Sequence, residues 1–355
     1  MDAKKIRITV LLGIAIVVLF VIAAERTFPA QFHKNNIIAS AEELSLRITE
    51  ELMDGDESFM TYVNGMTEEE LVAINQSLDG FFGHVDAYTI LRKVNADVYL
   101  VKFDLEVSNN YYVYQKIVNG KEIVNNMDAE ILATKVEMVM AECPGGSDYE
   151  KVKFYHDYIV THTEYGFLEG EDEILSYTAE GALLRGTAVC NGYAEAMELL
   201  LLCSNIETYM AVGYTDEGSH AWNIVKLEDD WYHVDTTWDD PVPDMGEEAL
   251  HVYLNISDEI MEKTHTWNRS AYPECTSLEH NYYEQEGAAF DSFNDFKSYV
   301  LAEMQTTNQI EVMVTDSENI QYDCGFVIKE GGASSVSWQN YEDGEYLVML
   351  ITVEK

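Results

Sequence analysis

The chain has 355 residues, a length typical of about two domains. Its hydrophobic content of 47% and charged content of 24% are ordinary for a globular protein, which excludes general disorder. Its 64 acidic residues against 21 Lys and Arg give a net charge of −43, which phosphate backbones and anionic lipid surfaces would repel. We therefore expect no nucleic-acid partner.

The N-terminal segment, residues 1–35, is predicted to meet a membrane. Residues 8–24 contain no charged side chain and follow the basic residues Lys4, Lys5 and Arg7. As a helix they would span about 26 Å, close to the thickness of about 30 Å of a hydrocarbon core. Basic residues on the leading side hold that end in the cytoplasm. We expect an uncleaved anchor or, alternatively, a cleaved signal peptide. Both place the body of the protein outside the cytoplasm.

Residues 36–125 are predicted to form an α+β region without recognisable chemistry. Helical spacing covers 40–52 and 68–77, and the first stretch opens with a capping-box pattern formed by Ser40 and Glu43. Strands are predicted at 98–106 and 111–118, the second ended by an Asn-Gly pair.

The rest of the chain is predicted to contain a core at 126–280 and a small α+β C-terminal domain at 281–355. Within the core, helices are expected at 129–143, at 149–163 and in the apolar run up to residue 203. The C-terminal domain is expected to hold a helix at 293–304 and strands at 310–314, 324–328 and 345–353.

Cys190 is the candidate nucleophile. The five cysteines are odd in number and form no C-x-x-C pair, which predicts neither a disulfide framework nor a zinc ribbon. Cys190 lies between glycines at a loop-to-helix junction, where unpaired N–H groups and the helix dipole favour a thiolate. The neighbouring Gly192 would let a substrate backbone approach closely. Cys203, inside the apolar run, is expected to be a buried hydrophobe.

A thiolate nucleophile needs an acid/base partner and a group that orients that partner. His220 opens a segment with strand-like alternation, and Asp235 lies in the next such segment. A tight turn centred on residues 229–230 would place His220 opposite Asp239, whereas a turn at 227–228, or an added bulge, would place it opposite Asp235. The pattern alone leaves both acids open as the orienting carboxylate.

Three segments, in this order, resemble the core of the transglutaminase-like superfamily. They are Ala-Val-Cys-Asn-Gly-Tyr at 188–193, Ser-His-Ala-Trp-Asn at 219–223 and Trp-Tyr-His-Val-Asp-Thr-Thr-Trp-Asp-Asp-Pro at 231–241. Weaker similarity extends over about 145–275. Bacterial members of this family have a papain-like fold. The resemblance therefore implies an α+β core in which the helix bearing the cysteine packs on an antiparallel sheet.

The resemblance also implies the roles of site residues. Cys190 would be the nucleophile, His220 the general acid/base and Asp235 the residue that orients the imidazole. Tyr165 would lie in the segment that lines the substrate cleft. Apart from the resemblance, Tyr193 and Trp222 are candidates for substrate binding because they neighbour Cys190 and His220, with core packing as the favoured alternative for most aromatic residues there. No metal and no cofactor are expected, because the acidic calcium loop and additional β-sandwich domains of the animal cross-linking enzymes have no counterpart in the sequence.

The expected reaction is attack of Cys190 on a carboxamide or peptide carbonyl, followed by resolution of the thioester by water rather than by an amine. The expected partner is a peptide or protein substrate associated with the cell wall. Two alternatives stay open. One is a non-catalytic module of this fold that binds a cell-wall component or a protein. The other is a mononuclear metal site built from His220, His233 and Asp235.

Overall fold

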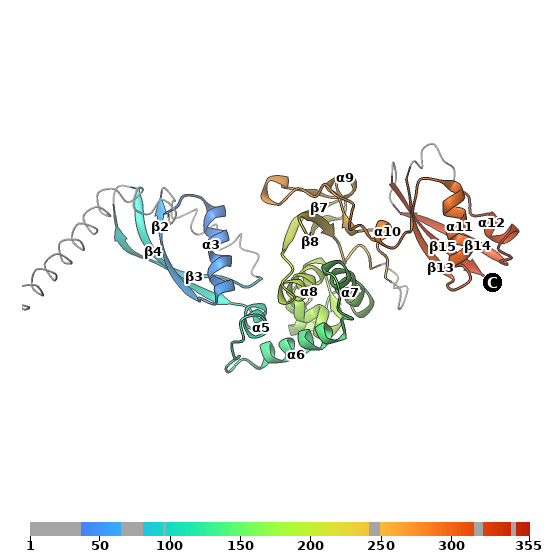
Figure 1. Ribbon diagram of the computed structural model, residues 1–355. Coiled ribbons are helices and arrows are strands. Elements are labelled where there is room, and N and C mark those ends of the chain that lie inside the picture. The colour runs from blue at the N-terminus through green and yellow to red at the C-terminus, as the bar shows by residue number, and fades with distance from the viewer. Residues whose placement is uncertain (1–36, 65–80, 95–96, 241–248, 316–321, 342–345) are drawn as a thin grey trace, which may run out of the picture. The chain divides into compact units, whose positions relative to one another are not determined.

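The computed structural model describes residues 37–64, 81–94, 97–240, 249–315, 322–341 and 346–355 (Figure 1). The predicted membrane segment and the predicted helix at 68–77 lie outside these residues. Among the residues that are described, no helix has the length and apolar character needed to cross a bilayer. The chain divides into two compact units, the first ending at Glu130 and the second beginning at Ile131.

The first unit contains a four-stranded sheet of order β1-β2-β4-β3. Its strands are β1 (Ile37–Ile38), β2 (Ser58–Asn64), β3 (Gly83–Lys93) and β4 (Val98–Val107). The helix α3 (Ala41–Asp54) begins where the capping pattern predicts, because the Ser40 hydroxyl accepts the Glu43 N–H at 3.2 Å. The predicted helix at 40–52 and strand at 98–106 are therefore confirmed.

The predicted strand at 111–118 is wrong, because these residues belong to the helix α5 (Asn109–Ile117). The Ser108 hydroxyl accepts the Tyr111 N–H at 3.4 Å and so caps the first turn. Tyr111 and Tyr114, three positions apart, are both buried. The aromatic and β-branched residues favour a strand by propensity, but the capped start and the burial at helical spacing outweigh that preference.

The second unit is centred on a five-stranded sheet of order β10-β9-β8-β7-β11, in which all neighbouring strands are antiparallel. The strands are β7 (Thr208–Thr215), β8 (Gly218–Leu227), β9 (Asp230–Val234), β10 (Leu254–Ile256) and β11 (Thr266–Trp267). Three helices precede them along the chain: α6 (Met127–Glu142), α7 (Asp148–His162) and α8 (Cys190–Cys203). The predicted helices of the core are thus confirmed.

The helix α8 is the structural centre of this unit. It lies against α7 and against β8, and the Asn223 side chain of β8 donates a hydrogen bond of 3.1 Å to the Ala194 carbonyl of α8. This double coverage explains why α8 is apolar around most of its circumference. An α+β core with the cysteine-bearing helix on an antiparallel sheet is therefore present, as expected.

Short elements connect the large ones. The strands β5 (Glu164–Tyr165) and β6 (Thr187–Ala188) pair in parallel just before α8. The remaining short helices are η1 (Gly170–Tyr177), η2 (Gly181–Arg185), α9 (Asp258–Met261), η3 (Arg269–Ala271) and α10 (Tyr282–Gln285).

The C-terminal part contains a four-stranded sheet of order β12-β13-β15-β14. Its elements are β12 (Ala289–Phe290), α11 (Phe293–Glu303), β13 (Gln309–Thr315), α12 (Phe326–Lys329), β14 (Ser335–Tyr341) and β15 (Tyr346–Glu354). The helix predicted at 293–304 and the strands predicted at 310–314 and 345–353 are confirmed. The strand predicted at 324–328 is wrong, since the chain there turns into α12 after the Asp323 carboxylate accepts the Gly325 N–H at 2.7 Å.

This C-terminal part packs against the core through a shared hydrophobic cluster. Buried residues of both sheets, for example Trp222 of β8 and Val312 of β13, belong to one hydrophobic cluster. The predicted boundary near residue 280 therefore falls inside the second compact unit.

Candidate active site

Cys190 is the first residue of α8. The residue before it, Val189, has extended backbone angles and a side chain that cannot cap the helix. The first N–H groups of α8 therefore keep their donor capacity, and the positive end of the helix dipole lies at the Cys190 sulfur. Cys190 is half-buried, whereas Cys203 at the other end of the same helix is buried.

Gly192 positions this helix start and does not serve a substrate as the sequence suggested. A Cβ on Gly192 would lie 2.7 Å from the Ser176 carbonyl oxygen and 2.9 Å from the Thr178 carbonyl oxygen. The preceding turn is held to the same segment, because the Val189 N–H donates to the Ser176 carbonyl at 2.9 Å. Protein backbone, rather than substrate backbone, makes the close approach to this glycine.

Replacing Gly192 with alanine is therefore expected to lower the melting temperature. Forcing a methyl group against two carbonyl oxygens costs about 1–3 kcal/mol, as for other overpacked sites. Thermal unfolding of the variant measures the loss. Gly166→Ala is the matched control, because a Cβ there meets only the Thr187 methyl, at 3.7 Å. Equal melting temperatures for both variants would contradict the packing role.

His220 connects the sulfur to a carboxylate. It is the third residue of β8, and its Nε2 lies 2.7 Å from Asp235 Oδ2 in a buried setting. Its ring also lies close enough to the Cys190 side chain to lower the pKa of the thiol, and because Nε2 faces Asp235, Nδ1 is the nitrogen left for the sulfur. The indole of Trp222 stacks on the imidazole, with ring centroids 5.9 Å apart, and restricts its rotation.

The β8–β9 turn lies at residues 228–229, between the two positions that the sequence offered. Leu227 pairs with Asp230 and Asn223 with Val234, so neither predicted register is correct. Glu228 has a φ of +55°, the left-handed conformation that a two-residue hairpin turn uses. Because β9 ends at Val234, Asp235 leaves the ladder and turns toward His220.

Asp235, rather than Asp239, is the acid beside His220. Asp235 Oδ1 accepts the N–H groups of Thr237 at 3.0 Å and Trp238 at 3.1 Å, which fix the carboxylate in the loop. Asp239 instead lies 3.0 Å from the Nε2 of His156 on α7. The choice that the sequence left open is thus made by the loop that follows β9.

The electrostatics of the three groups are coupled. Burial by itself raises the pKa of the Cys190 thiol, but the hydrogen bond and charge of His220 and the N–H of Ala221 bring that pKa below its ordinary value. Burial by itself lowers the pKa of His220, but the Asp235 carboxylate raises it to about 10. Burial by itself raises the pKa of Asp235, but His220 brings that pKa below its ordinary value. A thiolate beside an imidazolium is the state these shifts favour near neutral pH.

Two of the three predicted substrate-binding residues are buried. The Tyr193 ring has no exposed surface, and its single hydroxyl hydrogen lies within reach of two acceptors, the Thr163 carbonyl at 2.9 Å and the Asp240 carboxylate. Trp222 is also buried, and its Nε1 donates to His233 Nδ1 at 2.9 Å. Both residues therefore support the site from within. Tyr165 differs, because 49% of its surface is exposed. Partial burial is the larger cause that raises the pKa of its hydroxyl, and a thiolate at the nearby Cys190 raises this pKa further.

Sequence reasoning did not give His265 a role. His265 Nε2 lies 3.2 Å from Asp235 Oδ2, the oxygen that also faces His220, and the imidazole is buried. It packs against the Trp238 indole with ring centroids 4.5 Å apart. The signal available in the sequence was its position in the His-Thr-Trp segment at 265–267, which belongs to the weaker part of the family resemblance.

The metal site considered from the sequence is not assembled. His233 Nε2 lies 2.8 Å from Asp258 Oδ1, and its Nδ1 accepts a hydrogen bond from Trp222. With one nitrogen donating and the other accepting, this imidazole has no lone pair left for an ion. His220, Asp235 and His265 do lie close enough together to hold one. An ion there would compete for the imidazole that Cys190 needs.

Residues 138–236 match the family model described as the transglutaminase-like superfamily. This range contains Cys190, His220 and Asp235, the three residues that the structure brings together. The chain therefore carries a transglutaminase-like domain, as its three motifs predicted.

Among known proteins, the human Kyphoscoliosis peptidase is 23% identical over 151 residues, which are 39% of this chain and 21% of that protein. The mouse Kyphoscoliosis peptidase is 29% identical over 105 residues, which are 26% of this chain and 16% of that protein. The chain thus matches about a fifth or less of the length of these curated relatives.

Solved structures are similar at a lower level. A crystal structure of a TGase is 16% identical, with a TM-score of 0.27, and the match covers 57% of this chain and 59% of that one. The periplasmic domain of TgpA from Pseudomonas aeruginosa is 12% identical, with a TM-score of 0.25, and the match covers 51% of this chain and 72% of that one.

Proposed function

We propose that this protein is a cysteine enzyme that cleaves amide or peptide bonds through a thioester acyl-enzyme. One observation carries the proposal. The His220 imidazole lies 2.7 Å from the buried Asp235 carboxylate and close enough to Cys190, at the start of a buried helix, to lower the pKa of its thiol. A nucleophile, a base within hydrogen-bond reach and a group that orients the base are the parts that acyl transfer requires.

In the acylation step the Cys190 thiolate attacks the carbonyl carbon and forms a C–S bond. The carbonyl oxygen becomes an oxyanion, which the Cys190 N–H at the start of α8 is positioned to stabilise. The His220 imidazolium donates its proton to the amine nitrogen as the C–N bond breaks. A thioester on Cys190, a free amine and a neutral imidazole remain.

In the deacylation step the neutral His220 takes a proton from a water molecule as that water attacks the thioester. The C–S bond breaks, and a carboxylic acid and the thiolate–imidazolium pair are formed. An amine in place of water would give transfer instead of hydrolysis. We propose hydrolysis, because water is abundant in the extracytoplasmic space where the basic and apolar N-terminal residues are expected to place the body.

The proposed substrate is a peptide or protein associated with the cell wall. The mammalian relatives are named as a peptidase, which agrees with a peptide substrate. Among the aromatic residues named from the sequence, the exposed Tyr165 is the one available to contact it.

Alkylation of the intact protein tests the thiolate directly. We expect Cys190 to react with iodoacetamide with a pH midpoint below the value of about 8.5 of an ordinary thiol, because His220 lowers its pKa. Alkylation falls as acid protonates the thiolate. Peptide mass spectrometry of samples treated between about pH 4 and about pH 10 measures the rate at each cysteine.

Cys203 is the internal control, since burial raises the pKa of this thiol to about 12 and should leave it unreactive in the folded protein. Reaction of Cys190 with a midpoint at or above that of an ordinary thiol would contradict the enzyme. It would favour instead a non-catalytic module that binds a wall component or a protein.

A further inference from the structure

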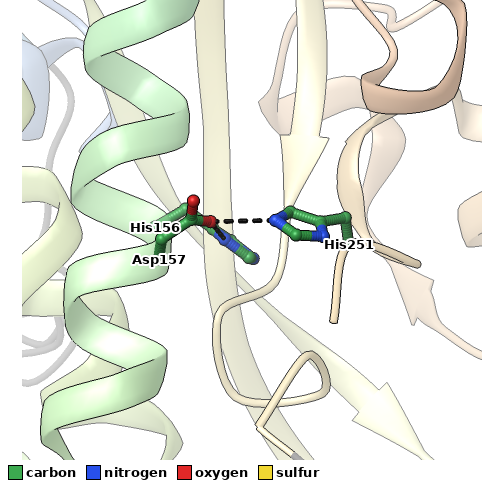
Figure 2. A group of neighbouring side chains, drawn as sticks. All are labelled: His156, Asp157 and His251. Carbon is green, nitrogen blue, oxygen red and sulfur yellow. Dashed lines mark hydrogen bonds and ion pairs between the residues drawn. The ribbon is translucent and has the colours of Figure 1, made fainter. Parts of the chain in front are cut away.

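A second cluster of titratable side chains lies outside the active site, where α7 meets the chain just before β10 (Figure 2). Asp157 Oδ1 is 3.0 Å from the Nδ1 of His156 and 3.0 Å from the Nε2 of His251. Figure 2 shows the Asp157 carboxylate joined to His251 by a dashed line, with the His156 side chain beside Asp157 on the same helix. One donor atom from each of the three residues lies within 4.8 Å of the other two.

The outer nitrogen of each imidazole faces a further carboxylate. His156 Nε2 lies 3.0 Å from Asp239 Oδ2, and His251 Nδ1 lies 2.9 Å from Glu311 Oε2. These carboxylates are held in turn, Asp239 by the Tyr253 N–H at 3.0 Å and Glu311 by the His251 N–H at 3.0 Å. Histidines that bind metal ions usually donate their second ring N–H to a carboxylate in this way, which fixes the tautomer and the ring orientation.

The number of hydrogens that the two imidazole rings would have to carry also favours a bound ion. A carboxylate accepts hydrogen bonds, so every ring nitrogen facing one must carry a hydrogen. Without an ion, both imidazoles would carry two hydrogens and a positive charge, although their ring centroids are 5.5 Å apart and both side chains are buried. One divalent cation in place of the two inner hydrogens leaves the net charge unchanged and removes this like-charge pair.

We propose that His156, Asp157 and His251 bind a divalent transition-metal ion of the Zn²⁺ type. Two imidazoles and one carboxylate suit zinc better than calcium or magnesium, which prefer oxygen ligands. Ligand atoms about 2.1 Å from a tetrahedral ion lie about 3.4 Å apart. The two N–O separations in the cluster are 3.0 Å, so each would widen by only about 0.4 Å when an ion binds.

Access and coordination number agree with such an ion. A cavity of about 330 Å³ is lined by His251 and Glu311, which places open space next to one of the three ligand residues. The other carboxylate oxygen of Asp157 is occupied by the Lys153 ammonium at 2.6 Å, which leaves Oδ1 as its single ligand atom.

The ion would have a structural role. It would join α7 to the segment before β10, and Glu311 of β13 extends the connection to the C-terminal sheet. Asp239 extends it to the loop that holds Asp235, through the Asp239 N–H that donates to the Asp235 carbonyl at 3.2 Å. The inference does not depend on Cys190 chemistry.

The test uses the full chain without a polyhistidine tag, stripped with a chelator. Calorimetric titration with Zn²⁺ is expected to give one equivalent bound, and Co²⁺ is expected to give visible absorption bands of an ion with nitrogen and oxygen ligands. Zn²⁺ should also raise the melting temperature, because an ion that binds only the folded state stabilises it. His251→Ala and the conservative Asp157→Asn should each weaken binding by 10-fold or more, as an order of magnitude for a lost ligand.

His233→Ala and His220→Ala are the matched controls, since each removes a histidine from one of the two other groups in which a histidine lies beside further acidic, histidine or cysteine side chains. Both should retain the ion. No Zn²⁺ or Co²⁺ binding by the folded wild-type chain would overturn the proposal. Binding that survives in folded Asp157→Asn but is lost in His220→Ala would overturn it too, by placing the ion at the active site. Loss of alkylation at Cys190 with retained Zn²⁺ binding would contradict the proposed enzyme alone.

Discussion

Replacing Cys190 with alanine is expected to abolish cleavage of every substrate, by a factor on the order of 10⁴–10⁶. No thioester can form without the sulfur, and an activated water would have to replace the nucleophile at a site built around the start of α8. The fold should persist, because Cys190 is only half-buried and its side chain is not part of the hydrophobic core.

The measurement is incubation of the protein with a mixed library of peptides and cell-wall fragments, with products identified by mass spectrometry. Cys203→Ala is the matched control, because it removes a thiol from the other end of the same helix, where that thiol is buried. It should keep full activity apart from a modest loss of stability. New carboxyl ends would identify hydrolysis, and new amide bonds would identify transfer. Products that persist in Cys190→Ala would show that the chemistry lies elsewhere.

Replacing Asp235 with asparagine is expected to lower the rate about 10³–10⁴-fold while leaving the loop in place. An amide oxygen can still accept the N–H groups of Thr237 and Trp238, but the negative charge 2.7 Å from His220 Nε2 is lost. That charge raises the pKa of His220 to about 10, against the lowering effect of burial. Without it the pKa of His220 should fall, and the imidazolium should be lost at a lower pH.

A pH–rate profile measures this effect, because the alkaline limb of the Asp235→Asn profile should move to lower pH. Asp258→Asn is the matched control, since Asp258 makes the same kind of pair with His233, at 2.8 Å. That variant should keep its rate and its alkaline limb. Equal losses in the two variants would indicate a general loss of stability rather than the orienting role of Asp235.

Most of the helices were predictable because the sequence signals that specify them are local. Capping residues such as Ser40 and apolar residues at helical spacing lie within one or two turns of chain, and the predicted helices around α7, α8 and α11 correspond to the observed ones. Cys190 was recognisable as a helix-start cysteine for the same reason. The errors at α5 and α12 are also local. The Ser108 cap begins α5 and the turn at Asp323 leads into α12, and each outweighs the strand preference of aromatic and β-branched residues.

Neighbours along the chain were thus enough to predict the α+β class, the cysteine at a helix start and the order in which a histidine and an acid follow it. Which acid faces His220 could be read only from the folded chain, because the choice of Asp235 over Asp239 depends on a two-residue turn and on where β9 ends. The folded chain also shows that Tyr193 and Trp222 are buried supports and that His156 and His251 meet at Asp157. Burial and contacts between distant segments follow from how α7, α8 and the sheet pack together, and residue spacing carries no measure of that packing.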